Sequence, residues 1–129
     1  MKNLSVLVCD DSELVRKQMI EVLTLIGVEN ILEAYDGEQA VIICKKQKPD
    51  LVFMDIIMPK KDGIAALKQI TQSNSTIKVV MASSSSSHSH LKKSLQLGAY
   101  TFIQKPISEK VILNIIQNLI EKRTIFSKD

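Results

Sequence analysis

Residues 51–63 read LVFMDIIMPKKDG, an apolar run that ends at Asp55 and passes into a polar turn. A short apolar run between turn residues is typical of a strand that is buried on both faces of a sheet. Similar runs occupy residues 4–9, 30–34, 77–82 and 100–103. Apolar residues at spacings of three and four predict helices at about 12–26, 38–48, 64–71, 91–97 and 108–123. This alternation predicts an α/β fold: a five-stranded parallel sheet with helices on both faces and right-handed crossovers.

The composition fits one compact domain. The chain has 129 residues, of which 45% are apolar, and this is enough to fill a single core. No glycine- or proline-rich hinge divides the sequence. We therefore expect one domain over residues 1–124 and a frayed tail over residues 125–129.

The sequence also limits where the chain is expected to reside. It contains no apolar run of about 18 or more residues, which predicts no membrane span. The N-terminus lacks the small-residue cleavage site of a secretory signal, so we expect a cytoplasmic protein. Cys9 and Cys44 fall inside predicted regular elements and are expected to be reduced core thiols.

The net charge of +3 does not by itself indicate a nucleic-acid binder. Such a protein is expected to carry a basic face with aromatic residues or an arginine-rich helix. Here aromatic residues make up 4% of the chain, tryptophan is absent, and the arginines are Arg16 and Arg123. We therefore expect no direct nucleic-acid partner, and the basic balance favours an acidic protein partner.

Charged and polar side chains follow the predicted strands. Asp10 and Asp11 follow the first strand, Asp55 the third, Ser83 the fourth and Lys105 the fifth. The carboxyl ends of parallel strands share one edge of a sheet, so these side chains are expected to meet there. Carboxylates favour a hard cation such as Mg²⁺, and an ammonium with a hydroxyl suits a phosphoryl group. The residues thus predict a site at which Asp55 accepts a phosphoryl group.

Each of these residues can also have a purely structural role when taken alone. Asp11 can cap the helix that follows it, as Ser12 also can, and Asp55 can be a turn residue. Ser83 opens a serine-rich loop, and Lys105 can be an ordinary surface lysine. The combination favours the phosphoryl site over these separate structural roles.

The run of serines at residues 83–87 is ambiguous. It can be a loop that closes on the phosphorylated site, or a low-complexity loop with no role beyond Ser83. His88 and His90 follow it, and we expect solvated histidines rather than a metal pair.

Five segments together carry a resemblance to a known family. They are Asp10-Asp11, the DIIMPKKDG stretch at residues 55–63, Ser83, Gly98-Ala99 and Lys105-Pro106. With these segments the chain resembles the receiver domains of two-component response regulators, and most of all the single-domain chemotaxis type. The resemblance covers nearly the whole chain. It implies a flavodoxin-like (βα)₅ fold with strand order 2-1-3-4-5.

The resemblance implies a role for each site residue. Asp55 would take a phosphoryl group from the phosphohistidine of a sensor histidine kinase. Asp11 and Asp55 would ligate Mg²⁺ directly, Asp10 would hold it through water, and the backbone carbonyl of Ile57 would supply a further ligand. Lys105 would contact the phosphoryl group.

The resemblance also implies a switch. Ser83 would move toward the phosphoryl group, and Phe102 on the fifth strand would shift inward and remodel the face of the fourth helix, fifth strand and fifth helix. Chemotaxis-type relatives typically carry Tyr at the Phe102 position, so coupling here has to be steric. Ile57 and Ser85 occupy positions that tune attack by water, and Ile57 is expected to hinder it and prolong the phosphorylated state.

The resemblance implies a monomer that is a stoichiometric phosphoacceptor rather than a turnover enzyme. Its expected target is a flagellar motor switch protein or another downstream protein. An alternative is a phosphorelay intermediate that passes its group to a histidine phosphotransfer protein. A third possibility is a scaffold that does not depend on phosphorylation, which the presence of all five site residues disfavours. A fourth is a flavodoxin-like cofactor-binding protein. It is disfavoured because Asp10-Asp11, rather than a phosphate-cradling Gly/Ser/Thr loop, follows the first strand.

Overall fold

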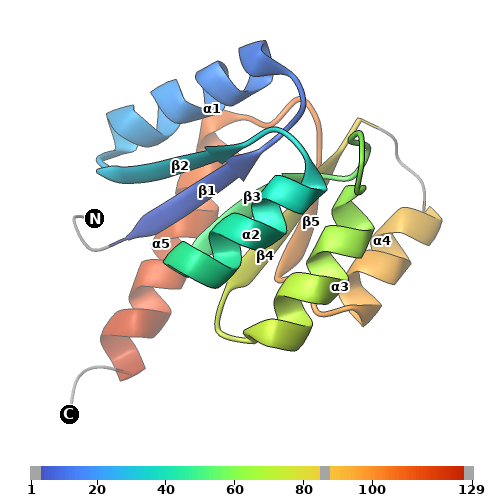
Figure 1. The fold of residues 1–129 in the computed structure, drawn as a ribbon. Coiled ribbons are helices and arrows are strands. Elements are labelled where there is room, and N and C mark those ends of the chain that lie inside the picture. Colours follow the sequence, from blue (N-terminus) through green and yellow to red (C-terminus); the bar gives the residue numbers. More distant parts are fainter. Residues whose placement is uncertain (1–3, 85–87, 127–129) are drawn as a thin grey trace.

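The structure is a computed structural model, and it describes residues 4–84 and 88–126. Strands and helices alternate along the chain from its first element to its last (Figure 1). The strands are β1 (Ser5–Cys9), β2 (Asn30–Ala34), β3 (Leu51–Asp55), β4 (Lys78–Ser83) and β5 (Thr101–Gln104). The helices are α1 (Glu13–Ile26), α2 (Gly37–Gln47), α3 (Gly63–Ser73), α4 (His88–Gln96) and α5 (Glu109–Phe126).

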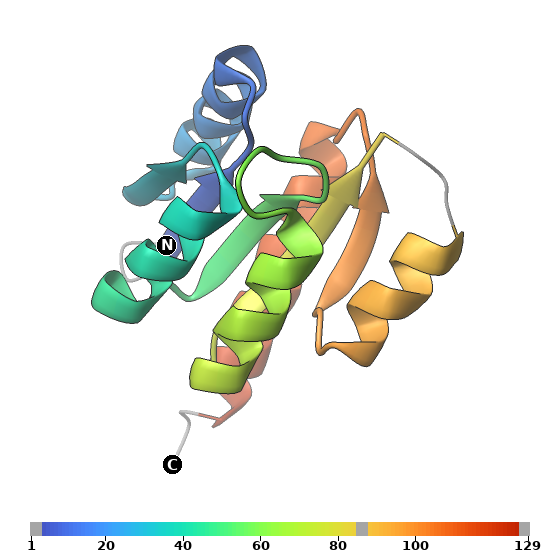
Figure 2. The ribbon, with the colours of Figure 1, turned by 45° about the vertical axis from the view of Figure 1, so that its right-hand side comes forward.

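The strands form one parallel sheet in the order β2-β1-β3-β4-β5. Helices α1 and α5 cover one face of this sheet, and α2, α3 and α4 cover the other (Figure 1). Figure 2 shows the sheet between these two layers, with the loop between β3 and α3 arching over its carboxyl edge. The predicted fold class and strand order are therefore confirmed.

The central strands lack the alternation of apolar and polar residues because both of their faces are buried. On β3, Val52 and Met54 pack with α2 and α3, whereas Leu51 and Phe53 pack with α1 and α5. All four side chains are at most 2% exposed. The continuous apolar run that precedes Asp55 is thus a consequence of its central position.

Side-chain caps begin four of the helices, and at the start of α5 the Ser108 hydroxyl accepts a hydrogen bond of 3.1 Å from the Val111 amide. The Ser12 hydroxyl accepts a hydrogen bond from the Val15 amide at the start of α1. Asp36 and Asp62 cap α2 and α3 in the same way. Of the two predicted candidates for the α1 cap, the structure uses Ser12, which leaves the Asp11 carboxylate free of that role.

Several boundaries differ from those predicted. Helix α4 begins at His88 rather than near residue 91, because its first turn is polar and gives no periodic apolar signal. Helix α5 continues to Phe126, so it runs into the expected tail over residues 125–129. The rest of that tail, residues 127–129, lies outside the described residues. Differences of this size are common at helix ends, where the last turns depend on local hydrogen bonds rather than on a core-facing pattern.

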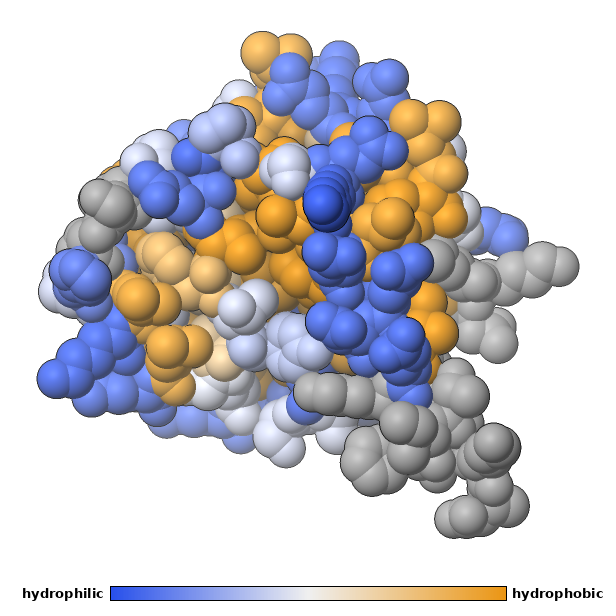
Figure 3. Space-filling view, turned by 180° about the vertical axis from the view of Figure 1, so that it is seen from behind, coloured by the Kyte–Doolittle hydropathy of each residue, from blue (hydrophilic) through white to orange (hydrophobic). Residues whose placement is uncertain are grey.

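No helix in the described part of the chain is both long and apolar enough to cross a bilayer. Figure 3 shows the molecule from behind, where apolar side chains gather between α1 and α5. A cavity of about 370 Å³ lies here, lined mainly by Val15, Met19, Val22, Ile107 and Ile112. Lys105 lines the same cavity, so this amine lies between the α1–α5 face and the carboxyl edge of the sheet.

Candidate functional site

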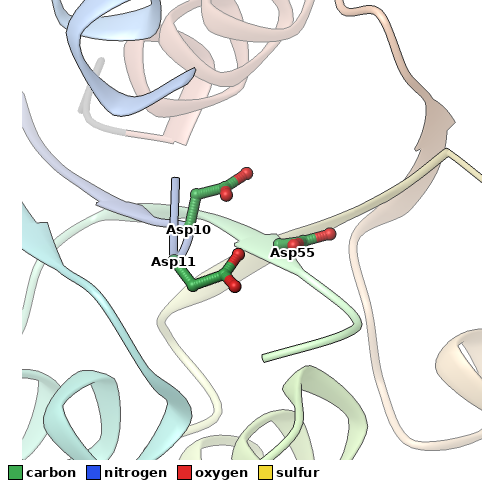
Figure 4. A group of neighbouring side chains, drawn as sticks. All are labelled: Asp10, Asp11 and Asp55. Carbon is green, nitrogen blue, oxygen red and sulfur yellow. The ribbon is translucent and has the colours of Figure 1, made fainter. Parts of the chain in front are cut away.

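Three carboxylates meet at the carboxyl edge of the sheet. Asp10 and Asp11 lie just beyond β1, and Asp55 ends the neighbouring strand β3 (Figure 4). One carboxylate oxygen from each residue lies within 4.8 Å of the others. The structure therefore brings together the three acidic residues that the sequence predicted would meet.

Asp10 is fixed from several directions. Its carboxylate is almost fully buried, and Oδ1 accepts a hydrogen bond of 2.9 Å from the Ser12 amide. Oδ2 accepts a hydrogen bond of 2.5 Å from Lys105 Nζ. The Asp10 amide donates to the Ala34 carbonyl at 3.1 Å, which extends the β1–β2 pairing by one residue. Asp11, by contrast, is exposed.

The backbone around Asp55 is held by a close approach of the loop between β3 and α3. The Gly63 amide donates to the Ile56 carbonyl at 2.6 Å, and the Ile56 amide donates to the Ala82 carbonyl at 3.1 Å. A Cβ atom on Gly63 would lie 2.1 Å from the Asp55 carbonyl oxygen. Only glycine permits this approach, which explains why the polar turn after Asp55 ends in Asp62-Gly63.

Lys105 joins the group from the far side of the sheet. It follows β5, and its amide donates to the Ser83 carbonyl at 2.8 Å. Its ammonium lies 3.4 Å from Asp55 Oδ1, in addition to its contact with Asp10. Ser83 ends β4 beside Asp55 and is 2% exposed. The four strand ends β1, β3, β4 and β5 thus supply the predicted residues Asp10, Asp11, Asp55, Ser83 and Lys105.

The electrostatics of the site are those of a crowded acidic pocket. Burial raises the pKa of Asp55, and the negative charges of Asp10 and Asp11 raise it further, while Lys105 partly offsets both effects. Burial lowers the pKa of Lys105, but its contacts with Asp10 and Asp55 outweigh burial and leave that pKa above its usual value. Lys105 is therefore an ammonium near neutral pH, and its single positive charge only partly offsets the negative charge of the three carboxylates.

These donors fit Mg²⁺. It prefers oxygen ligands and keeps several waters, so carboxylates that are close together without being in contact suit it. Three carboxylates against one ammonium leave an excess of negative charge for a divalent cation to neutralise. Asp10, Asp11 and Asp55 are the residues that would hold it.

Not every predicted functional residue lies in this pocket. Phe102 pairs with Met81 in the sheet and is half-buried against the core on the α2–α3 side. The Ile57 side chain lies in the loop after Asp55 and is 66% exposed. Phe102 is placed where it can act in a switch, and Ile57 lies near the edge of the pocket, but neither side chain belongs to the acidic group.

The remaining residues singled out in the sequence lie elsewhere. His88 and His90 are in the first turn of α4, outside the acidic group. Ser85, and with it most of the serine run, lies outside the described residues. Cys9 and Cys44 are buried, unpaired thiols, and burial raises the pKa of Cys44 to about 12 and that of Cys9 further. They are packed core residues, as expected.

Sequence reasoning missed one residue that touches the site. Arg16 donates from Nη1 to the Asp10 carbonyl at 2.7 Å and from Nε to Glu33 Oε1 at 3.1 Å. Its spacing of four from Ser12 places it one helical turn beyond the cap. That spacing could have indicated that Arg16 reaches back over the end of β1.

Comparisons with known proteins agree with this geometry. The family model described as "Response regulator receiver domain" matches residues 6–117. A chemotaxis protein CheY from Bacillus subtilis is 37% identical over 115 residues, which are 89% of this chain and 96% of that protein. A CheY from Treponema pallidum is 42% identical over 118 residues, 90% of this chain and 82% of that protein.

A solved structure gives the same result at the level of the fold. The crystal structure of the CheX–CheY–BeF₃–Mg²⁺ complex from Borrelia burgdorferi matches with a TM-score of 0.86 and 36% sequence identity. The match covers 92% of this chain and 90% of the chain in that complex. This neighbour shares both the architecture and more than a third of the aligned residues.

Proposed function

The chain belongs to the family of response regulator receiver domains, and from this premise we propose that Asp55 is its phosphoacceptor, charged by a histidine kinase. The observation that carries the proposal is the meeting of Asp10, Asp11 and Asp55 with Lys105 at one edge of the sheet. Receiver domains are stoichiometric phosphoacceptors, so the phosphoryl group is transferred to the protein itself rather than to a second substrate.

The transfer is a displacement at phosphorus. An Asp55 carboxylate oxygen attacks the phosphorus atom of the donor's phosphohistidine and forms a new P–O bond. The N–P bond breaks, and its electron pair returns to the imidazole nitrogen, which takes up a proton from solvent. Water later attacks the phosphorus atom, the P–O bond to Asp55 breaks, and inorganic phosphate leaves as the Asp55 carboxylate is regenerated.

The pocket suits this reaction because it can balance charge. When bound, Mg²⁺ supplies positive charge that offsets the charge of the phosphoryl oxygens. Asp11 and Asp55 would hold it directly and Asp10 through water, and the Ile57 backbone carbonyl would be the further ligand. The Lys105 ammonium, already between Asp10 and Asp55, pairs with a phosphoryl oxygen. The exposed Ile57 side chain hinders the approach of water and lengthens the life of the phosphorylated state.

Phosphorylation is proposed to switch the face formed by α4, β5 and α5. The Ser83 hydroxyl turns toward the phosphoryl group and draws the following loop inward. Phe102 then moves further into the core beside Met81, and the altered face binds a downstream protein. Because Phe102 has no hydroxyl, steric fit alone couples its position to the loop.

The downstream partner is proposed to be of the chemotaxis type, as a flagellar motor switch protein would be. The similarity to CheY proteins supports this choice, and the Borrelia relative is in a complex with CheX. A histidine phosphotransfer protein is the alternative partner. In either case the chain acts as a monomer in the cytoplasm, where a kinase can reach it.

Transfer of radiolabel from acetyl phosphate, in Mg²⁺, tests the acceptor. The wild-type chain and Asp50→Asn should take up label, whereas Asp55→Asn should take up none. Asp50 is a matched control because it precedes β3 at the opposite edge of the sheet, where its carboxylate accepts a hydrogen bond from the Ser5 amide. Label on Asp55→Asn at the wild-type level would remove Asp55 as the acceptor. A label lost within seconds from the wild-type chain would contradict the role assigned to Ile57.

A pull-down from the source lysate, with and without beryllofluoride and Mg²⁺, tests the switch and identifies the partner. Recovery of a protein only with both reagents supports a switched output face. Lys105→Arg should still accept label but should recover less of that protein, because its larger planar head cannot repeat the lysine's contacts. Equal recovery with and without beryllofluoride would argue for a scaffold that does not depend on phosphorylation.

A further inference from the structure

Arg16 is a largely buried cation that the phosphoacceptor chemistry does not use. Its side chain is 14% exposed, although it lies on the first turns of α1. Nη1 donates to the main-chain carbonyl of Asp10 at 2.7 Å, and Nε donates to Glu33 at 3.1 Å. The guanidinium therefore ties α1 to the ends of two neighbouring strands, β1 and β2.

The Asp10 carbonyl belongs to the peptide group that links Asp10 to Asp11. Its orientation fixes the direction in which the chain leaves β1 and hence where the Asp11 carboxylate lies. The Asp10 side chain has its own restraints in Ser12 and Lys105. The exposed Asp11 depends on the backbone for its placement, and Arg16 holds that backbone on the carbonyl side.

We propose that Arg16 is a positioning residue that sets the Mg²⁺ affinity of the pocket by holding the Asp10–Asp11 peptide in place. This inference rests on the proposed function, since it assumes that the three carboxylates bind Mg²⁺. Groups that orient metal ligands without touching the metal commonly control affinity 10- to 100-fold in other proteins. Arg16 does so through the backbone rather than through a ligand side chain.

A role for Arg16 as an ion pair alone, or as a positive charge alone, would change Mg²⁺ binding differently. As an ion pair with Glu33 it would matter little, because Glu33 is 51% exposed and such pairs are weak. As a positive charge it would repel Mg²⁺, and its removal would tighten binding. The positioning role has the opposite sign: removal of Arg16 weakens binding despite the loss of repulsion.

Isothermal titration of the full chain with MgCl₂ separates these three roles. Arg16→Met should bind Mg²⁺ about tenfold more weakly than the wild-type chain. Arg16→Lys keeps the charge but lacks the fork that reaches both Asp10 and Glu33, so it should also bind more weakly. Lys17→Met is the matched control. It removes one positive charge from the next residue of α1, whose ion pair with Glu13 is 70% exposed on both sides. It should bind at least as tightly as the wild-type chain.

Thermal unfolding in EDTA establishes that each variant is folded before titration. If Arg16→Met does not melt cooperatively, the Mg²⁺ affinity of Arg16→Lys alone tests the inference. The inference stands only if every folded Arg16 variant binds Mg²⁺ more weakly than both the wild-type chain and Lys17→Met, and any other order overturns it. A wild-type chain that binds no Mg²⁺ would instead overturn the metal site of the proposed function, and the role of Arg16 with it. This outcome differs from one in which the wild-type chain binds Mg²⁺ and the Arg16 variants bind it equally well, which would overturn the role of Arg16 alone.

Discussion

Asp55 is costly to keep ionised in the folded chain without a bound cation. Burial and the neighbouring carboxylates raise its pKa, and Lys105 offsets only part of that effect. A carboxyl group whose pKa rises on folding destabilises the fold wherever it is ionised. We expect Asp55→Asn to raise the free energy of unfolding by about 1 kcal/mol at pH 7 in EDTA.

The stability gained by Asp55→Asn should increase with pH. It should be full above the folded pKa of Asp55, and it should vanish below the unfolded carboxyl pKa of about 4, where both chains carry a neutral group. Urea denaturation at pH 7 and at pH 4 measures the difference between the two proteins. An Asp55→Asn chain that is less stable than wild type at pH 7 in EDTA would show that the pairing with Lys105 outweighs burial.

At the scale of elements, the loop between β3 and α3 depends on one close approach. A Cβ on Gly63 would lie 2.1 Å from the Asp55 carbonyl oxygen. The backbone would have to move to make room for this atom. Gly63→Ala should therefore cost about 3 kcal/mol of stability, at the upper end for overpacking. It should also weaken Mg²⁺ binding, because the displaced backbone carries Asp55.

Gly27→Ala is the control for that prediction. Gly27 ends α1 with a φ of 109°, but a Cβ there would meet nothing within 4 Å. The substitution should cost about 1 kcal/mol of backbone strain and leave Mg²⁺ affinity unchanged. Urea unfolding and titration of both variants measure the two effects, and equal losses of stability would refute the steric account of Gly63.

Helix α4 contains two unsatisfied polar atoms on its inner side. Ser94 Oγ and His90 Nδ1 are buried and, among the residues that the structure describes, have no hydrogen-bond partner. Because an unpaired buried hydroxyl costs free energy, Ser94→Ala should raise the free energy of unfolding by about 1 kcal/mol. Ser75→Ala, at an exposed turn, should change it by less than about 0.5 kcal/mol. A Ser94→Ala chain less stable than wild type in urea would indicate that the hydroxyl does have a partner.

At the scale of the whole molecule, the metal site exists only when the chain is folded. Lys105 and Asp10 are separated by 95 positions and meet only because β1 and β5 belong to one sheet. A ligand that binds only the folded state stabilises it by mass action. Free Mg²⁺ at 100 times its dissociation constant should therefore add about 2.7 kcal/mol and raise Tm.

The Asp55→Asn chain is the control for this Mg²⁺-dependent rise in Tm. Asp55→Asn removes one of the three carboxylates, so most of the Mg²⁺-dependent rise in Tm should disappear. Differential scanning calorimetry of both proteins across a range of MgCl₂ concentrations measures this difference. A rise in Tm of equal size in the two proteins would place the bound cation elsewhere.

The fold was readable from the sequence because its signals are local. The apolar run before Asp55 identified a doubly buried strand, and apolar residues at spacings of three and four located the five helices. The start of α4 at His88 was missed because its polar first turn carries no periodicity. The strand order came from the resemblance rather than from any local signal, since pairing in a parallel sheet is a long-range choice.

The acidic residues of the site could likewise be predicted from the sequence, but the residues that hold them in place could not. Strand ends predicted that Asp10, Asp11 and Asp55 would meet, because parallel strands place their carboxyl ends on one edge. The role of Gly63 and the reach of Arg16 could not be read, since both depend on distances between segments that are remote in sequence.

By itself, the sequence determined the succession of strands and helices and the residue types available for chemistry, because these depend on neighbours along the chain. Only the tertiary structure decided that Lys105 lies against Asp10, that Asp55 is crowded enough for its pKa to rise, and that Arg16 holds the Asp10 carbonyl. The reason is physical: such contacts require separate strand ends to be packed within a few ångströms, and the buried core on both faces of the sheet enforces that packing.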